Sequence, residues 1–193
     1  MPSNIDVEFT VPLPPDEYFE KYFYEEEYDK FQAKFLGLKD LVYELSEAVL
    51  DDPKKVKRRV KVVPNVPLPS IVLYYLGNEE MHYYDNYVKD HTTRSITFDE
   101  DPPIMQTYIK IHGTVSVLPD PDNPNQCKQS IRVHLDVDSL WIPGAAALIE
   151  SLLAAELERS YGLIPDALKA FLELKSDQAN GTVGVPKEDD NSN

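Results

Sequence analysis

Apolar residues recur at helical spacing over one long stretch near the C-terminal end of this 193-residue chain, from Gly144 to about Lys175. The stripe consists of Leu148, Ile149, Leu152, Leu153, Leu157, Tyr161, Ile164, Leu168, Phe171 and Leu172. The stretch is rich in Ala, Leu and Glu, which are strong helix formers. The pattern predicts a long amphipathic helix, and Gly162 and Pro165 predict a kink or short break within it.

The chain before this helix alternates between apolar and polar residues with a period of two. The clearest strands are Ile5 to Val11, Gln106 to Leu118 and Ser130 to Asp138. Residues 81–88 and 92–98 are predicted to be strand, either continuous or bent near Asp90 and His91. A long helix with one apolar face needs a broad apolar partner, which these strands supply. We therefore expect an α+β fold, in which a curved antiparallel β-sheet wraps around the C-terminal helix.

An aromatic stripe between Asp16 and Leu36 predicts one helix, or two short helices separated near Glu25, Glu26 and Glu27. Its members are Tyr18, Phe19, Tyr22, Phe23, Tyr28, Phe31 and Phe35. Aromatic residues at helical spacing are more often core than a ligand cage, so we assign them to the core. We interpret the acidic run as a solvent-exposed face.

Residues 38–52 fit either a helix or a strand, and the β-branched segment that follows favours a hairpin. The turn residues Asp51, Asp52 and Pro53 lie between the two arms. A register that pairs Leu50 with Lys55 matches apolar with apolar and acidic with basic side chains. It places Tyr43 opposite Val62, Leu45 opposite Val60, Glu47 opposite Arg58 and Glu44 opposite Lys61.

Composition indicates one domain over residues 1–175, followed by an acidic tail at 176–193 that we expect to be disordered. The net charge of −15 disfavours nucleic acid as a partner. The single cysteine, Cys127, excludes an internal disulfide and suits a reducing compartment. No targeting segment or apolar membrane span is visible, so we expect a cytoplasmic protein.

Three further segments carry a resemblance to a known family. They are VPLPSIVLYYLG at Val66–Gly77, IKIHGTVSV at Ile109–Val117 and LDVDSLWIPGAAALIE at Leu135–Glu150. In this order, over about residues 5–174, the chain resembles the START-like (SRPBCC) superfamily with its helix-grip fold, and most closely a poorly characterised group within it. The resemblance implies a cavity between sheet and helix. Members of the superfamily mostly bind lipids, sterols and other hydrophobic molecules there, while some are cyclases or dehydratases and others are co-chaperones.

The predicted hairpin and helix together define a candidate ligand cavity. Its lining residues would be Tyr43, Leu45, Glu47, Arg58, Val60, Tyr83, Tyr87, Leu148, Leu152, Tyr161 and Phe171. The pair Glu47 and Arg58 would orient the polar end of a ligand, unless the strand ends twist outward and solvate it. The segment around Pro69, Ile71 and Leu73 would act as a gate.

The leading hypothesis is therefore binding or intracellular transfer of a hydrophobic small molecule such as a lipid or sterol, with at most transient peripheral membrane contact. The main alternative is a protein-interaction module or co-chaperone-like adaptor that docks through the basic strand Lys54–Lys61, although acidic neighbours would neutralise part of that strand. The third hypothesis is a cyclase or dehydratase that uses Glu47, or Asp90 and His91, as acid or base. No nucleophile motif, metal-ligand spacing or phosphate loop is present, so we assign no catalytic residue, metal or cofactor.

Overall fold

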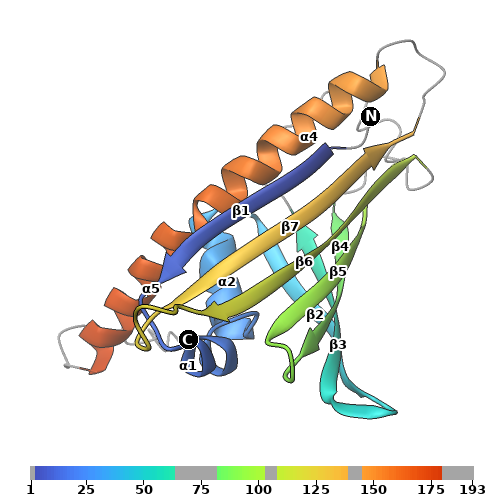
Figure 1. Cartoon of the computed structure of the whole chain (residues 1–193). Helices are drawn as coiled ribbons and strands as arrows, with labels where there is room; N and C mark the ends of the chain where they lie inside the picture. Colours follow the sequence, from blue (N-terminus) through green and yellow to red (C-terminus); the bar gives the residue numbers. More distant parts are fainter. Residues whose placement is uncertain (1–2, 64–81, 103–107, 139–144, 180–193) are drawn as a thin grey trace, which may run out of the picture.

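A computed structural model describes residues 3–63, 82–102, 108–138 and 145–179. Seven strands form one antiparallel sheet in the order β1-β7-β6-β5-β4-β3-β2, and helices lie against one side of it (Figure 1). The strands are β1 (Ser3–Val11), β2 (Asp40–Val49), β3 (Asp52–Val63), β4 (Tyr83–Asp90), β5 (Ser95–Asp101), β6 (Ile109–Pro119) and β7 (Cys127–Val137). The sheet is curved, as the sequence predicted.

Four helices complete the described fold: α1 (Pro15–Lys21), α2 (Glu26–Phe35), α4 (Ala145–Gly162) and α5 (Ile164–Ala179). The long C-terminal helix is bent, because α4 ends at Gly162 and α5 begins at Ile164, which confirms the predicted interruption. The aromatic stripe forms two helices, α1 and α2, rather than one. The C-terminal helix continues to Ala179, beyond the predicted boundary at Lys175; residues 180–193 lie outside the described part of the chain.

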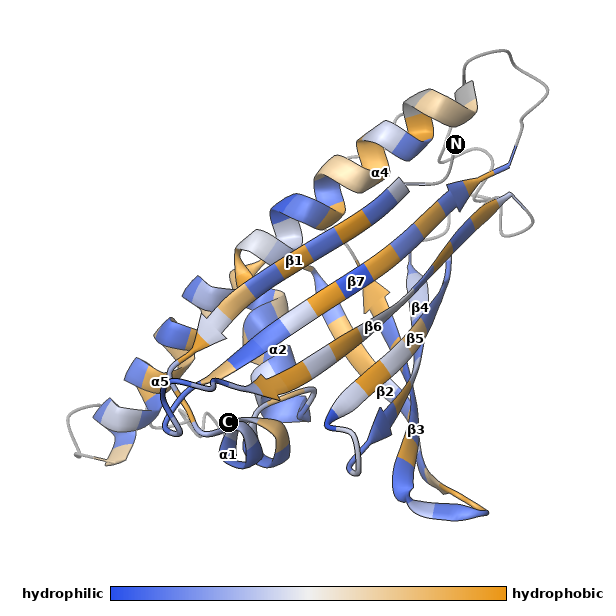
Figure 2. Cartoon of the chain, viewed as in Figure 1, coloured by the Kyte–Doolittle hydropathy of each residue, from blue (hydrophilic) through white to orange (hydrophobic). Residues whose placement is uncertain are grey.

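One face of the sheet, the inner face, carries the core. Apolar residues alternate with polar ones along β1, β6 and β7, and Figure 2 shows this alternation. The inner face of these strands is buried at Ile5, Val11, Ile109, Ile111, Val115, Val117, Ile131, Val133, Leu135 and Val137. Each strand thus presents every second side chain to the helices.

The helices cover different parts of the inner face. Helix α4 packs against β1 and β7, α1 against β6, and α2 against β2 and α5. Two hydrogen bonds between distant parts of the chain fix this arrangement: Ser3 Oγ donates to Glu150 of α4 at 2.6 Å, and Tyr18 of α1 donates to Gln129 of β7 at 2.5 Å.

Candidate functional site

Polar and aromatic side chains replace the apolar pattern on the inner face of β4. Tyr83, Asp85, Tyr87 and Lys89 follow one another at every second position, and Tyr87 and Lys89 are buried. Alternation places all four on the same side of the strand. Glu100 joins them from β5, because it pairs directly with Asp85 across the sheet.

The β2–β3 hairpin exists as predicted, but its register differs from the prediction. Tyr43 lies opposite Val60, not Val62, and a bulge follows, so that Leu45 lies opposite Arg59 and Glu47 opposite Lys57. The irregularity shifts the alternation by one residue. Tyr43 and Val60 are on the inner face, whereas Leu45 and Glu47 are exposed beside outer-face residues, which corrects their assignment to a cavity.

Arg58 is on the inner face, but its partner comes from a helix end rather than from β2. The guanidinium lies 3.5 Å from the carboxylate of Glu25, the residue before α2, and donates a hydrogen bond to the carbonyl of Tyr24. It also lies 5.7 Å from the centre of the Tyr43 ring. The predicted pair of Arg58 with Glu47 is thus wrong. Glu25, whose side chain is 33% exposed, pairs with inner-face residues, whereas Glu26 and Glu27 are exposed as predicted.

A chain of hydroxyl groups leads from β4 to a carboxyl group of α2. Tyr87 donates to the hydroxyl of Tyr43 at 3.4 Å, and Tyr43 donates to Asp29. Burial raises the pKa of Asp29 to about 7, and burial also raises the pKa values of both tyrosines. Asp29 therefore titrates near neutral pH, while both phenols stay protonated there.

Lys89 is buried and fully satisfied. Its ammonium group donates to the carbonyls of Phe19 and Phe23 at 2.9 and 2.7 Å, and to Glu25 at 2.7 Å. The side chain also lies 4.7 Å from the centre of the Phe19 ring. Lys89 thus joins β4 to the end of α1, and we assign it a structural role.

Asp85 and Glu100 form a second group on the inner face. Burial raises the pKa of Asp85 to about 7. Burial and the neighbouring Asp85 carboxyl raise the pKa of Glu100 well above its usual range. Tyr83 lies two residues before Asp85 on the same face of β4, and the two carboxyl groups help to raise the pKa of Tyr161 of α4.

The other residues that were predicted to line the cavity lie in different environments. Phe171 is in the core, where its ring packs against Tyr28 at 5.3 Å and Phe31 at 5.1 Å. Leu152 is 62% exposed on α4. The side chain of Leu148 and the predicted gate residues Pro69, Ile71 and Leu73 lie outside the described part of the structure.

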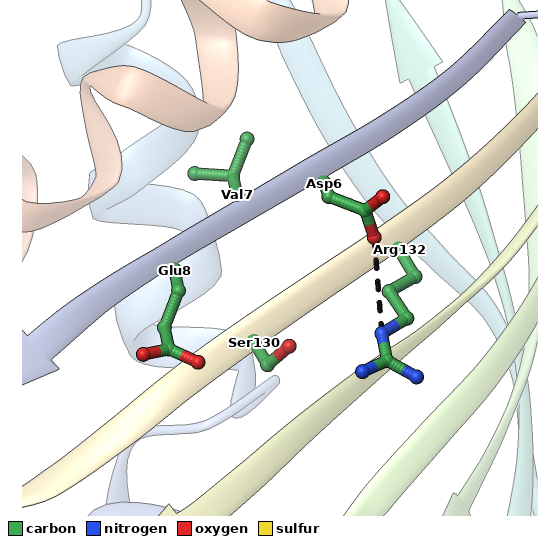
Figure 3. A pocket seen from close by; sticks show the side chains of 5 residues that line it. All are labelled: Asp6, Val7, Glu8, Ser130 and Arg132. Atoms are coloured by element: carbon green, nitrogen blue, oxygen red, sulfur yellow. Dashed lines mark ion pairs between the residues drawn. The ribbon is translucent and has the colours of Figure 1, made fainter.

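The outer face of the sheet carries a shallow, open depression of about 490 Å³ between β1 and β7, and Figure 3 shows the side chains around it. Asp6 and Arg132 form an ion pair of 3.7 Å there, with both side chains more than two-thirds exposed. Glu8 and Ser130 complete the polar lining. This depression is on the opposite face from Asp29 and Asp85, and its exposed ion pair is typical of ordinary protein surface.

The other candidates for chemistry are placed away from the inner face or are buried. His91 and Asp90 are at the turn between β4 and β5, where His91 contacts Glu20 at 3.0 Å. Cys127 is buried at the start of β7, and burial raises the pKa of its thiol to about 11. Among the described residues, no three His, Cys, Asp or Glu side chains gather where they could hold a metal ion. Within the same residues, no helix is long and apolar enough to cross a membrane.

Sequence reasoning missed the carboxyl groups of the inner face: Asp29, Asp85 and Glu100. A signal for Asp85 was present, because it lies between Tyr83 and Tyr87, and both tyrosines were already assigned to the inner face. Glu100 would have followed from pairing β4 with β5. Asp29 had no comparable signal, since only the packing of α2 against β2 brings it to Tyr43.

Comparison with known proteins supports the fold through structure rather than through sequence. No protein-family model and no curated protein sequence matches the chain. The protein TTHA0849 from Thermus thermophilus is similar, with a TM-score of 0.59, 13% identity, and coverage of 90% of this chain and 99% of that one. The Zhui aromatase/cyclase from Streptomyces sp. R1128 follows with a TM-score of 0.56, 12% identity, and coverage of 96% and 100%.

Truncated norcoclaurine synthase from Thalictrum flavum is similar to the same degree, with a TM-score of 0.56, 14% identity, and coverage of 89% of this chain and 94% of that one. At these identities the likeness shows the fold alone. The curved antiparallel sheet with its bent C-terminal helix is the helix-grip arrangement that the resemblance implied.

Proposed function

We propose that the protein binds a small hydrophobic molecule carrying polar groups, between the inner face of β3–β5 and the C-terminal helices. The observation that carries this proposal is a set of ionisable groups that lie, largely shielded from solvent, among the apolar side chains of the inner face. Asp85 of β4 pairs with the buried Val60 of β3, and Arg58 lies two residues before Val60 on the same face. Tyr43, which is opposite Val60 on β2, donates a hydrogen bond to Asp29 of α2. A face that served only as core would be apolar, because burying charge costs stability.

The similar solved structures include an aromatase/cyclase and a norcoclaurine synthase, and this supports a small-molecule ligand. Intracellular transfer of such a ligand is the form of the function that we favour. The buried, unpaired Cys127 is compatible with a reducing, cytoplasmic environment.

The proposal is tested by titrating the purified chain with 1-aminoanthracene, a fluorescent aromatic molecule that is neutral at pH 7. We expect saturable binding in the micromolar range. Val60→Trp places a bulky side chain beside Asp85 and should weaken binding at least about tenfold. Val42→Trp is the matched control, because Val42 is 41% exposed and its side chain is outside the network.

Thermal melts followed by circular dichroism show whether both variants are folded. Native mass spectrometry of gently purified protein then identifies any molecule that remains bound. Absence of saturable binding to the native chain, or equal binding by Val60→Trp and the native chain, would contradict the proposal.

One observation favours acid–base catalysis as a second candidate function. The pKa values of Asp29 and Asp85 are both about 7, and a general acid or base works best when its pKa is near the working pH. A cyclase or dehydratase would release its ligand with a changed mass, for instance lower by one water. Recovery of the bound molecule unchanged after incubation with the native chain would argue against this role. Conversion that stops in Asp85→Asn would support it.

A further inference from the structure

Two carboxyl groups interrupt an otherwise apolar row across the inner face. Asp85 and Glu100 are directly opposite each other in the β4–β5 pair, flanked by Val60 on one side and Ile111 on the other. Side chains directly opposite in an antiparallel pair have Cβ atoms about 4.5–5.5 Å apart. Two ionised carboxylates at this separation would repel each other, so the pair needs either a bound proton or a counter-charge.

Neither carboxyl group has a partner within the described part of the chain. Asp85 Oδ1 is shielded from solvent and accepts no hydrogen bond there, and no ion pair among the described residues involves Glu100. The two cations of the inner face are already engaged elsewhere, since Arg58 and Lys89 both pair with Glu25. The chain therefore neutralises its buried cations but leaves these two acids without a counter-charge from the residues described.

Two tyrosines interact electrostatically with the same pair. Tyr83 and Tyr161 interact with both carboxyl groups, and burial raises the pKa of each phenol well above its usual value. The phenols therefore stay neutral and add no further negative charge beside the two carboxyl groups. Aromatic faces attract organic cations, and the attraction grows when the site is desolvated. Carboxyl groups beside tyrosines are the chemistry that recognises a protonated amine.

We propose that Asp85 and Glu100 bind a protonated amine on the ligand, with Tyr83 and Tyr161 supplying aromatic faces beside it. An amine fits better than a metal ion, since Ca²⁺ takes about six to eight oxygen ligands and the described residues offer no group of three acidic or metal-binding side chains. The ammonium group would donate hydrogen bonds to both carboxylates and remove their mutual repulsion. This subsite rests on the proposed function, because it forms one end of the same ligand site.

The test compares two probes of nearly equal shape, tryptamine and indole-3-ethanol, by isothermal titration calorimetry at pH 7.5. Tryptamine carries an ammonium group where indole-3-ethanol carries a hydroxyl. The native chain should bind tryptamine at least about tenfold more tightly. The double variant Asp85→Asn with Glu100→Gln should bind both probes within about twofold of each other and keep its affinity for indole-3-ethanol.

Asp99→Asn is the matched control. Asp99 is the neighbour of Glu100 in β5 but is exposed on the other face of the sheet, so this change removes one nearby carboxylate without touching the subsite. It should keep the full preference for tryptamine, which excludes a general effect of the chain's net charge of −15. Circular dichroism confirms that each variant is folded.

The outcomes separate the two proposals. If indole-3-ethanol binds and tryptamine binds no better, the amine subsite is wrong while ligand binding stands. If the double variant keeps the preference, or Asp99→Asn loses it equally, the subsite is also wrong. If neither probe binds the native chain and 1-aminoanthracene does not bind either, both proposals fail.

Discussion

The ammonium group of Lys89 lies 2.7 Å from the carboxylate of Glu25, and this ion pair joins the inner face of β4 to the residue before α2. The Lys89 side chain is 1% exposed, and its other two hydrogen bonds go to carbonyls at the end of α1. Burial lowers the pKa of Lys89, while Glu25 raises it. One side chain therefore holds both N-terminal helices against the sheet.

Replacement of Lys89 by Met should lower the free energy of unfolding by about 2–4 kcal/mol. The substitution keeps the length of the side chain but leaves the carbonyls of Phe19 and Phe23 and the Glu25 carboxylate without their shared donor. Urea denaturation followed by circular dichroism measures the change. Lys21→Met is the control, because the exposed Lys21 pairs with Glu17 one turn earlier on the surface of α1, and it should leave the midpoint unchanged. Equal effects of the two substitutions would show that Lys89 does not anchor the helices.

Glu25→Gln should destabilise the protein by roughly 1–3 kcal/mol, because Glu25 neutralises Arg58 as well as Lys89. Glu47→Gln tests the corrected register of the hairpin. Glu47 is exposed opposite Lys57, so its replacement should have no measurable effect on the urea midpoint. A larger loss in Glu47→Gln than in Glu25→Gln would restore the pairing of Glu47 with Arg58 that the sequence suggested.

Gly113→Ala should be poorly tolerated. A Cβ at this position in β6 would collide with the carbonyl oxygen of Arg132 and would lie 2.7 Å from the Phe98 ring. Because strand backbone must move to make room, we expect a loss of about 1–3 kcal/mol in the free energy of unfolding. Gly162→Ala is the matched control: a Cβ there meets nothing within 4 Å, and the helix propensity of alanine should raise stability by up to ~1 kcal/mol. A Gly113→Ala variant as stable as the native chain would contradict the close packing of Phe98 on Gly113.

The fold was predictable because the apolar residues of each helix and strand recur with the period of that element. The alternation from Ile5 to Val11 and the helical stripe from Leu148 to Leu172 needed no knowledge of tertiary contacts. The break near Gly162 was also local, since glycine and proline act on the backbone directly. The sheet and the helix each have one apolar face, and both faces are buried when the helix packs against the sheet.

The hairpin register was not predictable in the same way. Glu44 and Leu45 both lie beside Arg59, because the β2 strand has one extra residue at the bulge, and neither residue type marks a bulge. Charge matching also misled: Arg58 has an acidic partner, but that partner is Glu25, which lies far away in sequence. Prediction of the site residues requires knowledge of such tertiary contacts, whereas the helices and strands can be predicted from the local sequence pattern.

Stability should fall as the pH rises towards and through neutrality, because Asp29 and Asp85 are buried carboxyl groups. Their folded-state pKa values are about 7, against an ordinary value of 3.8. Below about pH 4 both states hold the protons, and the groups contribute no difference. As the pH rises, the unfolded chain releases these protons first, so unfolding becomes more favourable until the folded state also ionises near pH 7.

The measurement is urea denaturation at several values between about pH 5 and about pH 8. The native chain should lose on the order of 1–4 kcal/mol over this interval, since each unit of pKa difference corresponds to about 1.4 kcal/mol. Asp29→Asn with Asp85→Asn should flatten the dependence, and Asn can still accept the hydrogen bond from Tyr43. Asp99→Asn, on the outer face, should keep the native slope. Equal slopes in the native chain and the double variant would mean that these two carboxyl groups ionise normally in the folded protein, and the case for a buried acidic site on the inner face would fail with them.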